Sequence, residues 1–332
     1  MATTTPACCE RFACSSSPNF SVRWQALQIL GNLEPATLAQ HAEAVVTRLE
    51  DSHGDVRTAA MQTLGKMEPA TIAQHADAVV AMLDDSSEYV REEALRTLCE
   101  LEPATLTQHV DTLVPMLEDS DMSVGIVASK TLAKLDPATI AHHADALIDI
   151  LDDSKGYVRR GALKTLGRLD PATLAQHVDV VVAKIEDSCW CVRIEALHTL
   201  DKLGPATLAQ YLDAVVARLK DCDIHVRITA LETLGKLVPA TLAQHVDVIV
   251  TKLADLNERV RRAALELLGK LEPATLAQHA DAVVARLEDS AWDVRKMALE
   301  TLGKLEPAAF DAARAMHHER EVEAWRRMRD EL

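Results

Sequence analysis

Four residues near the middle of the sequence have the types that bind a metal. Cys189 and Cys191 form a Cys-x-Cys pair, and Cys222 and His225 follow as Cys-x-x-His. Three thiolates and one imidazole would suit zinc. The two pairs must come close together for this, and cysteines outside established zinc spacings are usually ordinary small residues. We therefore predict no bound metal, and a zinc measurement on Cys191→Ser tests the alternative.

Histidine recurs at a fixed interval and resembles a column of metal ligands. Consecutive histidines belong to elements that we expect to pack about 10 Å apart, whereas zinc binds imidazole at about 2 Å. Neighbours in the column therefore cannot share one ion, and we interpret it as a product of sequence duplication. Tyr211 replaces histidine once in the column, whose members are His41, His75, His109, His143, His177, His245 and His279.

Catalytic motifs are missing from the sequence. It has no Gly-rich phosphate loop, no nucleophile elbow and no zinc-protease helix motif. We predict that the protein is not an enzyme and that it needs no cofactor.

The elements that carry these residues follow an internal repeat. Prolines stand 34 residues apart from Pro35 to Pro307, without an insertion. We expect a flexible leader at 1-20, a repeat array at 21-306 and a charged C-terminal capping helix at 307-332. The array comprises a half repeat at 21-34 and eight full repeats at 35-68, 69-102, 103-136, 137-170, 171-204, 205-238, 239-272 and 273-306.

Each full repeat contains two stretches of helical periodicity, and positions are counted here from its first proline. The first stretch, helix A, is shown in the last repeat by Leu276, Ala280, Val283, Val284 and Leu287. The second, helix B, is shown there by Val294, Ala298, Leu299, Leu302 and Leu305. A repeat is therefore predicted to be a helical hairpin, which buries its apolar stripe only by stacking on its neighbours.

Local signals place the helix ends. Glu272 before Pro273 predicts an N-cap followed by proline at the first position of helix A. Ser290 and Asp293 have the order of a cap for helix B. Gly303 lies where helix B should end.

The string Asp-x-x-x-x-Val-Arg-x-x-Ala-Leu, seen from Asp289 to Leu299, resembles the signature of HEAT repeats. The resemblance implies an all-α fold, a right-handed α-α superhelix of eight HEAT-like hairpins with a terminal half repeat and a capping helix. It also implies a ladder of Asp and Arg side chains between neighbouring turns. The Asp members are Asp51, Asp85, Asp119, Asp153, Asp187, Asp221, Asp255 and Asp289. The Arg members are Arg23, Arg57, Arg91, Arg159, Arg193, Arg227, Arg261 and Arg295.

The third repeat departs from this pattern. Gly125 replaces the ladder arginine and Ser129 replaces the usual core leucine. Glycine inside a helix costs about 1 kcal/mol relative to alanine. We therefore predict a soft point or bend between residues 119 and 135, and hydrogen exchange no faster there than in neighbouring repeats would contradict it.

Composition limits the partners and the compartment. Apolar residues make up 48% of the chain and aromatic residues 3%, so the core must consist of small aliphatic side chains. A net charge of −16 repels phosphate backbones, and no apolar run is long enough to cross a bilayer. Seven cysteines without a shared spacing indicate a reducing compartment. We expect an intracellular, cytoplasmic protein; an organellar compartment is the alternative, because the leader is rich in Ser and Thr.

Positions 19 to 21, between the two helices, vary most among the repeats. If packing fixes the repeated residues, these variable positions are free to contact partners. Aromatic residues are enriched at binding hot spots. The alternative is that each ring packs on its own turn. The candidate partner-binding residues at this A–B edge are Tyr89, Tyr157, Trp190, Ile224 and Trp292.

Two columns on helix B, at positions 28 and 32, are predicted to face outward. Position 28 is basic in the first half of the array, where Arg96, Lys130 and Lys164 are candidates for binding acidic segments. Position 32 is mostly lysine throughout. The alternative is a solvated face with pairs such as Glu300 and Lys304.

Together these features predict a non-catalytic scaffold or adaptor for other proteins or extended peptide segments. It would bind partners through the A–B edge and the concave face that helix B lines. We expect it neither to bind nucleic acid nor to insert into a membrane. One alternative is a structural linker subunit fixed within a larger assembly. Another is a HEAT-type protein-modifying enzyme.

Overall fold

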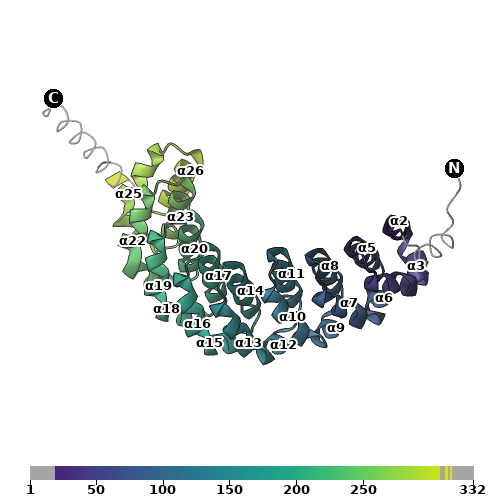
Figure 1. The fold of residues 1–332 in the computed structure, drawn as a ribbon. Helices are drawn as coiled ribbons and strands as arrows, with labels where there is room; N and C mark the ends of the chain where they lie inside the picture. Colours follow the sequence, from purple (N-terminus) through teal and green to yellow (C-terminus); the bar gives the residue numbers. More distant parts are fainter. Residues whose placement is uncertain (1–18, 307–310, 313–314, 316–332) are drawn as a thin grey trace. The chain divides into compact units, whose positions relative to one another are not determined.

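The computed structural model describes residues 19–306, 311–312 and 315. The predicted leader, apart from Asn19 and Phe20, and nearly all of the predicted capping helix lie outside these residues. The chain divides into two compact units, Met1–Asp170 and Pro171–Leu332, and the boundary coincides with a junction between repeats. Figure 1 labels the elements in chain order. The described residues contain helices and turns and no strand.

Unit 1 (Met1–Asp170) contains the half repeat and four full repeats. Helix B of these repeats corresponds to α2 (Phe20–Leu30), α5 (Gly54–Leu64), α8 (Glu88–Cys99), α11 (Met122–Leu132) and α14 (Gly156–Leu166). Helix A corresponds to α3 (Pro35–Leu38), η1 (Ala39–His41), α4 (Ala42–Val46), η2 (Thr47–Glu50), α6 (Pro69–Gln74), α7 (Ala76–Ala81), η3 (Met82–Asp84), α9 (Pro103–Thr107), α10 (Val110–Leu113), η4 (Pro115–Glu118), α12 (Pro137–His142), α13 (Ala144–Asp149) and η5 (Ile150–Asp152).

Unit 2 (Pro171–Leu332) contains the other four full repeats. Its helix B elements are α17 (Trp190–Leu200), α20 (Ile224–Leu234), α23 (Glu258–Leu268) and α26 (Trp292–Leu302). Its helix A elements are α15 (Pro171–Gln176), α16 (Val178–Ala183), η6 (Lys184–Glu186), α18 (Pro205–Gln210), α19 (Leu212–Ala217), η7 (Arg218–Lys220), α21 (Pro239–Leu242), η8 (Ala243–His245), α22 (Val246–Thr251), η9 (Lys252–Ala254), α24 (Pro273–Ala277), α25 (Ala280–Val284) and η10 (Ala285–Glu288).

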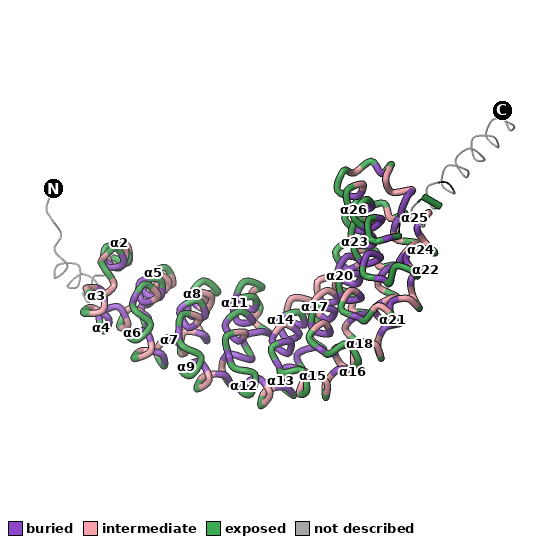
Figure 2. The backbone as a smooth tube through the Cα atoms, turned by 180° about the vertical axis from the view of Figure 1, so that it is seen from behind, coloured by how far each residue is buried: buried purple, intermediate pink, exposed green. Residues whose placement is uncertain are grey.

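Within each unit the hairpins stack in chain order, as the sequence predicts. In unit 1, helix B elements from α2 to α14 pack side by side, and the helix A segments form a second layer (Figure 1). The buried residues lie between the two layers (Figure 2). Most of them are aliphatic; Leu64 and Leu98, for example, are fully buried. The predicted all-α fold of stacked HEAT-like hairpins is confirmed.

Helix A is not the single helix that its periodicity predicts. In the second repeat α6 ends at Gln74, and His75 has φ −116° and ψ 17°, outside the helical range. A second short helix, α7, then begins at Ala76 and ends in a 3₁₀ turn. The histidine column therefore marks a corner inside helix A. Apolar spacing continues through this corner, so the sequence pattern alone does not reveal it.

The predicted order of N-cap and proline at the start of helix A is confirmed, whereas the predicted cap of helix B is wrong. Glu272 occupies the N-cap position before Pro273, but its side chain makes no capping hydrogen bond. Asp136 does cap, because its shorter side chain accepts a hydrogen bond from the Thr139 N–H. The N-cap of α26 is Ala291, so Ser290 and Asp293 do not form the predicted capping box.

Candidate functional site

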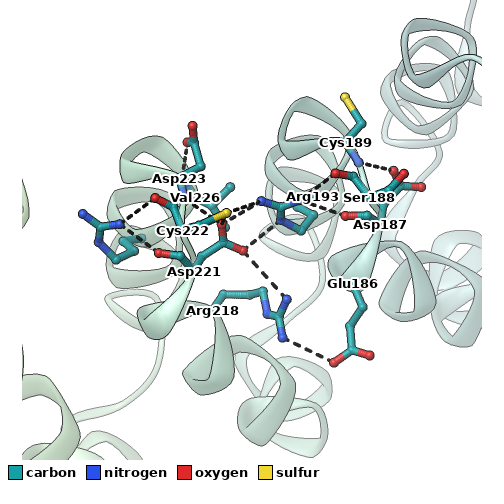
Figure 3. A network of polar contacts seen from close by, with 11 residues as sticks. Glu186, Asp187, Ser188, Cys189, Arg193, Arg218, Asp221, Cys222, Asp223 and Val226 are labelled. Carbon is teal, nitrogen blue, oxygen red and sulfur yellow. Dashed lines mark hydrogen bonds and ion pairs between the residues drawn. The ribbon is translucent and has the colours of Figure 1, made fainter.

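Arginine and aspartate side chains join neighbouring turns, as the HEAT resemblance implies. Arg57 donates through Nε and Nη2 to both carboxylate oxygens of Asp85, at 2.6 and 2.7 Å. Its Nη1 donates to the backbone oxygen of Asp51 at 2.9 Å, so one guanidinium ties two turns together. Figure 3 shows the corresponding network in unit 2. Further pairs of the same kind include Arg23–Asp51, Arg91–Asp119, Arg193–Asp221, Arg227–Asp255 and Arg261–Asp289.

These contacts shift the ionisation of the aspartates. Burial alone would raise the pKa of Asp85, but hydrogen bonds from Arg57 and from the Ser87 N–H outweigh it and hold the pKa below its ordinary value. The pKa values of four more ladder aspartates are lowered as well: Asp51, Asp119, Asp221 and Asp289. The ladder is therefore built from ionised carboxylates.

Four lysines at position 32, Lys66, Lys134, Lys270 and Lys304, contact the preceding repeat and form a second ladder. Lys270 donates to the Gly235 carbonyl at 3.2 Å, and Lys304 donates to the Gly269 carbonyl at 2.5 Å. Each lysine thus satisfies a carbonyl at the end of the preceding helix B, where a positive charge is favourable. The Glu300–Lys304 pair, considered as the alternative, does not form, because Lys304 donates to this carbonyl and Glu300 lies 3.8 Å from Lys296 of its own helix.

A third set of contacts uses buried threonines at position 29, which the sequence analysis did not single out. The Thr63 hydroxyl lies 3.2 Å from the Leu27 carbonyl of the preceding helix B and 2.7 Å from the Ala59 carbonyl of its own helix. Thr131 makes the same two contacts. The recurrence of threonine at position 29, between apolar core positions, was the sequence signal that could have predicted these contacts.

The histidine column lies along the helix A side. His143 Nδ1 lies 3.6 Å from an Asp111 carboxylate oxygen of the preceding repeat. Tyr211, which replaces histidine once, donates from its hydroxyl to Asp179 at 2.9 Å. Members of the column can therefore contact an aspartate of the preceding repeat.

Tyr157 takes over part of the role of the arginine that the third repeat lacks. Its hydroxyl donates to the Asp119 carbonyl at 2.8 Å. In other repeats the arginine at position 23 donates to the equivalent carbonyl, as Arg57 does to Asp51. A side chain at Gly125 would place its Cβ 3.2 Å from the Tyr157 ring. The ring therefore occupies the space beside Gly125 and is only half exposed.

The other residues predicted at the A–B edge differ in exposure. Tyr89 is 64% exposed, Trp190 49% and Trp292 63%, whereas Ile224 is half-buried. The Lys296 ammonium lies 5.5 Å from the Trp292 ring centre. These rings lie on separate turns, at the N-terminal ends of helix B.

Leu256 is an exposed apolar residue that the sequence analysis missed. It is 100% exposed at position 18 of its repeat. The signal was present, because this position holds serine or cysteine in every other full repeat.

A groove on helix B of unit 1 brings two of the three basic candidates together. It has a volume of about 470 Å³, lies over α5, α8 and α11, and is lined in part by Lys66, Arg96 and Lys130. Arg96 pairs with Glu92 of its own helix at 2.5 Å, and Lys130 is exposed. Lys164 lies on α14, outside the groove lining, and is half-buried.

The surrounding charges distinguish the two units. Neither α11 nor α14 contains an acidic residue, although together they carry Lys130, Arg159, Arg160 and Lys164. In unit 2 every helix B contains glutamate. The groove there, about 320 Å³ in volume, is lined by residues of both signs, including Glu232.

The four candidate metal ligands do not form one site. Cys189 and Cys191 are in contact, whereas Cys222 lies near the Arg193–Asp221 pair and His225 faces the Trp190 ring. In Figure 3 the Cys189 sulfur points away from Cys222. The described part of the chain contains no group of three or more His, Cys, Asp or Glu residues that could hold a metal ion. Within the same residues, no helix combines the length and the apolar character that a membrane span requires.

Comparison with known families agrees with this architecture. The family model of the adaptin N-terminal region matches residues 42–275. The chain belongs to this family. A model of HEAT repeats matches residues 246–327 of this adaptin-like chain. This family and fold are those of protein-interaction scaffolds. A search of curated proteins found no match to the sequence of this chain.

Two solved structures share the fold of this adaptin-like chain. One is an engineered protein, with a TM-score of 0.56 and 19% identity over 92% of this chain and 91% of that one. The other comes from a study of Kap95p binding to RanGDP, with a TM-score of 0.65 and 15% identity over 92% of this chain and 47% of that one. The chain thus spans about half the length of the second relative.

Proposed function

We propose that the protein is a non-catalytic scaffold that binds acidic peptide segments on the helix B face of α11 and α14. The absence of acidic residues from both helices carries this proposal. Membership in the adaptin N-terminal family supports a scaffold in general. The particular surface and the charge of its partner are inferred from this chain alone.

The chemistry of the face suits an amphipathic acidic segment. Lys130 and Lys164 occupy the same repeat position on the adjacent helices α11 and α14 and supply positive charge. Met122 and Ile126 are exposed apolar residues on α11, 54% and 38% accessible. A segment with alternating carboxylates and aliphatic side chains would match both features. The whole chain has a net charge of −16, so an acidic segment would be repelled by the rest of the molecule.

Fluorescence anisotropy with synthetic peptides tests the proposal. The probes are a labelled peptide of Glu and Leu and a charge-reversed peptide of Lys and Leu. We expect the acidic peptide to bind and the affinity to fall at least tenfold in Lys130→Glu/Lys164→Glu. The matched control, Lys220→Glu/Lys252→Glu, makes the same change in net charge on the helix A side and should change affinity less than twofold. Equal losses in both variants would show that only net charge matters and would refute the site.

The exposed rings of the A–B edge are further binding anchors in this proposal, with Tyr89 in unit 1 and Trp190 and Trp292 in unit 2. Tyr89, Trp190 and Trp292 present large apolar area, and such rings are common binding anchors. If the protein is instead a linker fixed in a larger assembly, it will purify from native extract at constant stoichiometry with one set of subunits. If the protein is instead a HEAT-type modifying enzyme, incubation with its partner will yield a covalently modified partner that no longer stays bound.

A further inference from the structure

Cys189 and Cys191 form a close pair of thiols in the A–B turn of the fifth repeat. Their Sγ atoms are 2.8 Å apart, in hydrogen-bond contact. Cys189 is the N-cap residue of α17, and Cys191 lies in the first turn of this helix. Two thiols in contact on one short turn need little backbone movement to form a bond.

The pair is accessible to small reagents. Both cysteines are half-buried. The residues beside Cys189, Ser188 and Trp190, are exposed on the surface of the turn. A small molecule can therefore approach the sulfurs without unfolding of the repeat.

The surroundings of Cys189 favour a thiolate. Burial alone would raise the pKa of the Cys189 thiol, but hydrogen bonds from the Cys191 thiol and from the N–H groups of Cys191 and Val192 outweigh it, so the pKa is lowered. N–H groups at the start of α17 supply two of these bonds. A thiolate, and not a thiol, attacks a disulfide.

The other cysteines within the described residues lack this arrangement. Cys222 lies in the next turn, where its sulfur contacts Arg193 and Asp221 and not another thiol. Cys99 is at the end of α8, away from the A–B edge. The close thiol pair is therefore a local property of the fifth repeat.

We propose that Cys189 and Cys191 are a redox-active dithiol that closes to an intramolecular disulfide by exchange with a low-molecular-weight disulfide. The Cys189 thiolate attacks one sulfur of this disulfide, forms a mixed disulfide and releases one thiolate. Cys191 then loses its proton and attacks the Cys189 sulfur, which closes the Cys189–Cys191 bond and releases a second thiolate. The protein gives up two electrons and two protons, and the small disulfide becomes two thiols.

The closed form would alter the A–B edge at Trp190. This residue lies between the two cysteines, and its ring centre is 6.1 Å from that of His225 in the next repeat. A covalent bridge across its backbone restrains the turn that presents the indole. Redox state would thereby change an exposed aromatic surface, and this effect is independent of peptide binding at α11 and α14.

Mass spectrometry of the folded, full-length chain tests the proposal. The protein is equilibrated with mixtures of reduced and oxidised glutathione, quenched in acid, alkylated with N-ethylmaleimide and digested with trypsin. Residues 185–193 form a tryptic peptide that contains Cys189 and Cys191 and no other cysteine. We expect this peptide to become lighter by two hydrogens and to escape alkylation as the oxidised fraction rises.

Three results would overturn the proposal. One is a doubly alkylated 185–193 peptide under conditions that attach glutathione to Cys222. Another is a stable peptide with two glutathione adducts, and the third is a cross-link to the 221–227 peptide of Cys222. In the variant Cys191→Ser, the mixed disulfide at Cys189 should persist, because no second thiol resolves it. Cys222→Ser is the matched control and should leave closure unchanged.

Discussion

The contact between Tyr157 and the turn of the third repeat yields a quantitative prediction. Tyr157→Phe removes the hydroxyl that donates to the Asp119 carbonyl at 2.8 Å and lies 3.3 Å from the Ser120 carbonyl. The ring remains beside Gly125. The substitution therefore isolates the hydrogen bond from the packing.

The expected cost follows from the surroundings of the bond. A net intramolecular hydrogen bond contributes about 0.5–1.5 kcal/mol. The Lys155 ammonium, 3.4 Å from the same carbonyl, stays in place, and the half-exposed turn admits water. Both reduce the free-energy cost of losing the hydroxyl. We therefore expect a local destabilisation of about 0.5–1 kcal/mol, which corresponds to roughly a two- to fivefold larger opening constant for this turn.

Native-state hydrogen exchange measures this effect where it occurs. Repeats in a stacked array contact only their neighbours, so amide exchange should accelerate mainly in peptides between residues 119 and 132. Tyr89→Phe is the matched control, because Tyr89 has the same position in its repeat but is 64% exposed and lies next to a repeat that retains Arg57. The reasoning is refuted if the two substitutions change exchange equally. The same wild-type data test whether residues 119–135 are the predicted soft point.

Four further predictions concern the ladders, the third repeat and metal binding. Arg57→Ala should lower the free energy of unfolding of the chain by about 2 kcal/mol in urea titrations, because it leaves the carboxylate of Asp85 without its partner. Stability should be constant from about pH 7 to 5 and fall below about pH 4, because the pKa of Asp85 is lowered in the folded state: its contribution is complete above the unfolded value of about 3.9 and is lost as the pH falls through the lower folded pKa. In Asp85→Asn this fall should be smaller. Gly125→Ala should be more favourable by about 1 kcal/mol in a Tyr157→Ala background than in the wild type, because the new Cβ would lie 3.2 Å from the ring, and additive energies in a double-mutant cycle would contradict this contact. Addition of a chelator should leave the melting temperature unchanged, and a drop of several degrees would indicate a bound metal.

The sequence was sufficient for the hairpin, its length and most of its core. A strict 34-residue period with two apolar stripes can bury those stripes only by stacking, so it predicts an all-α fold of stacked hairpins. The resemblance to HEAT repeats implied the Arg–Asp ladder, and the structure contains it in pairs such as Arg57–Asp85. The sequence was not sufficient for the corner at His75, because a helix break that preserves the apolar spacing leaves the pattern unchanged. The role of Lys304 also escaped, since its carbonyl partner belongs to the preceding repeat.

The candidate site shows the same division. The position in the repeat made Tyr89, Trp190 and Trp292 candidates for exposure but left open that each ring packs on its own turn; in the structure all three are exposed. Tyr89 and Tyr157 occupy the same position of the repeat, and this position by itself gives no reason to treat them differently. The structure separates them, because position 23 of the preceding repeat is arginine for Tyr89 and glycine for Tyr157. Whether a ring lies in solvent or packs on its neighbour depends on the volume that another repeat leaves open, and this volume exists only after the repeats have stacked.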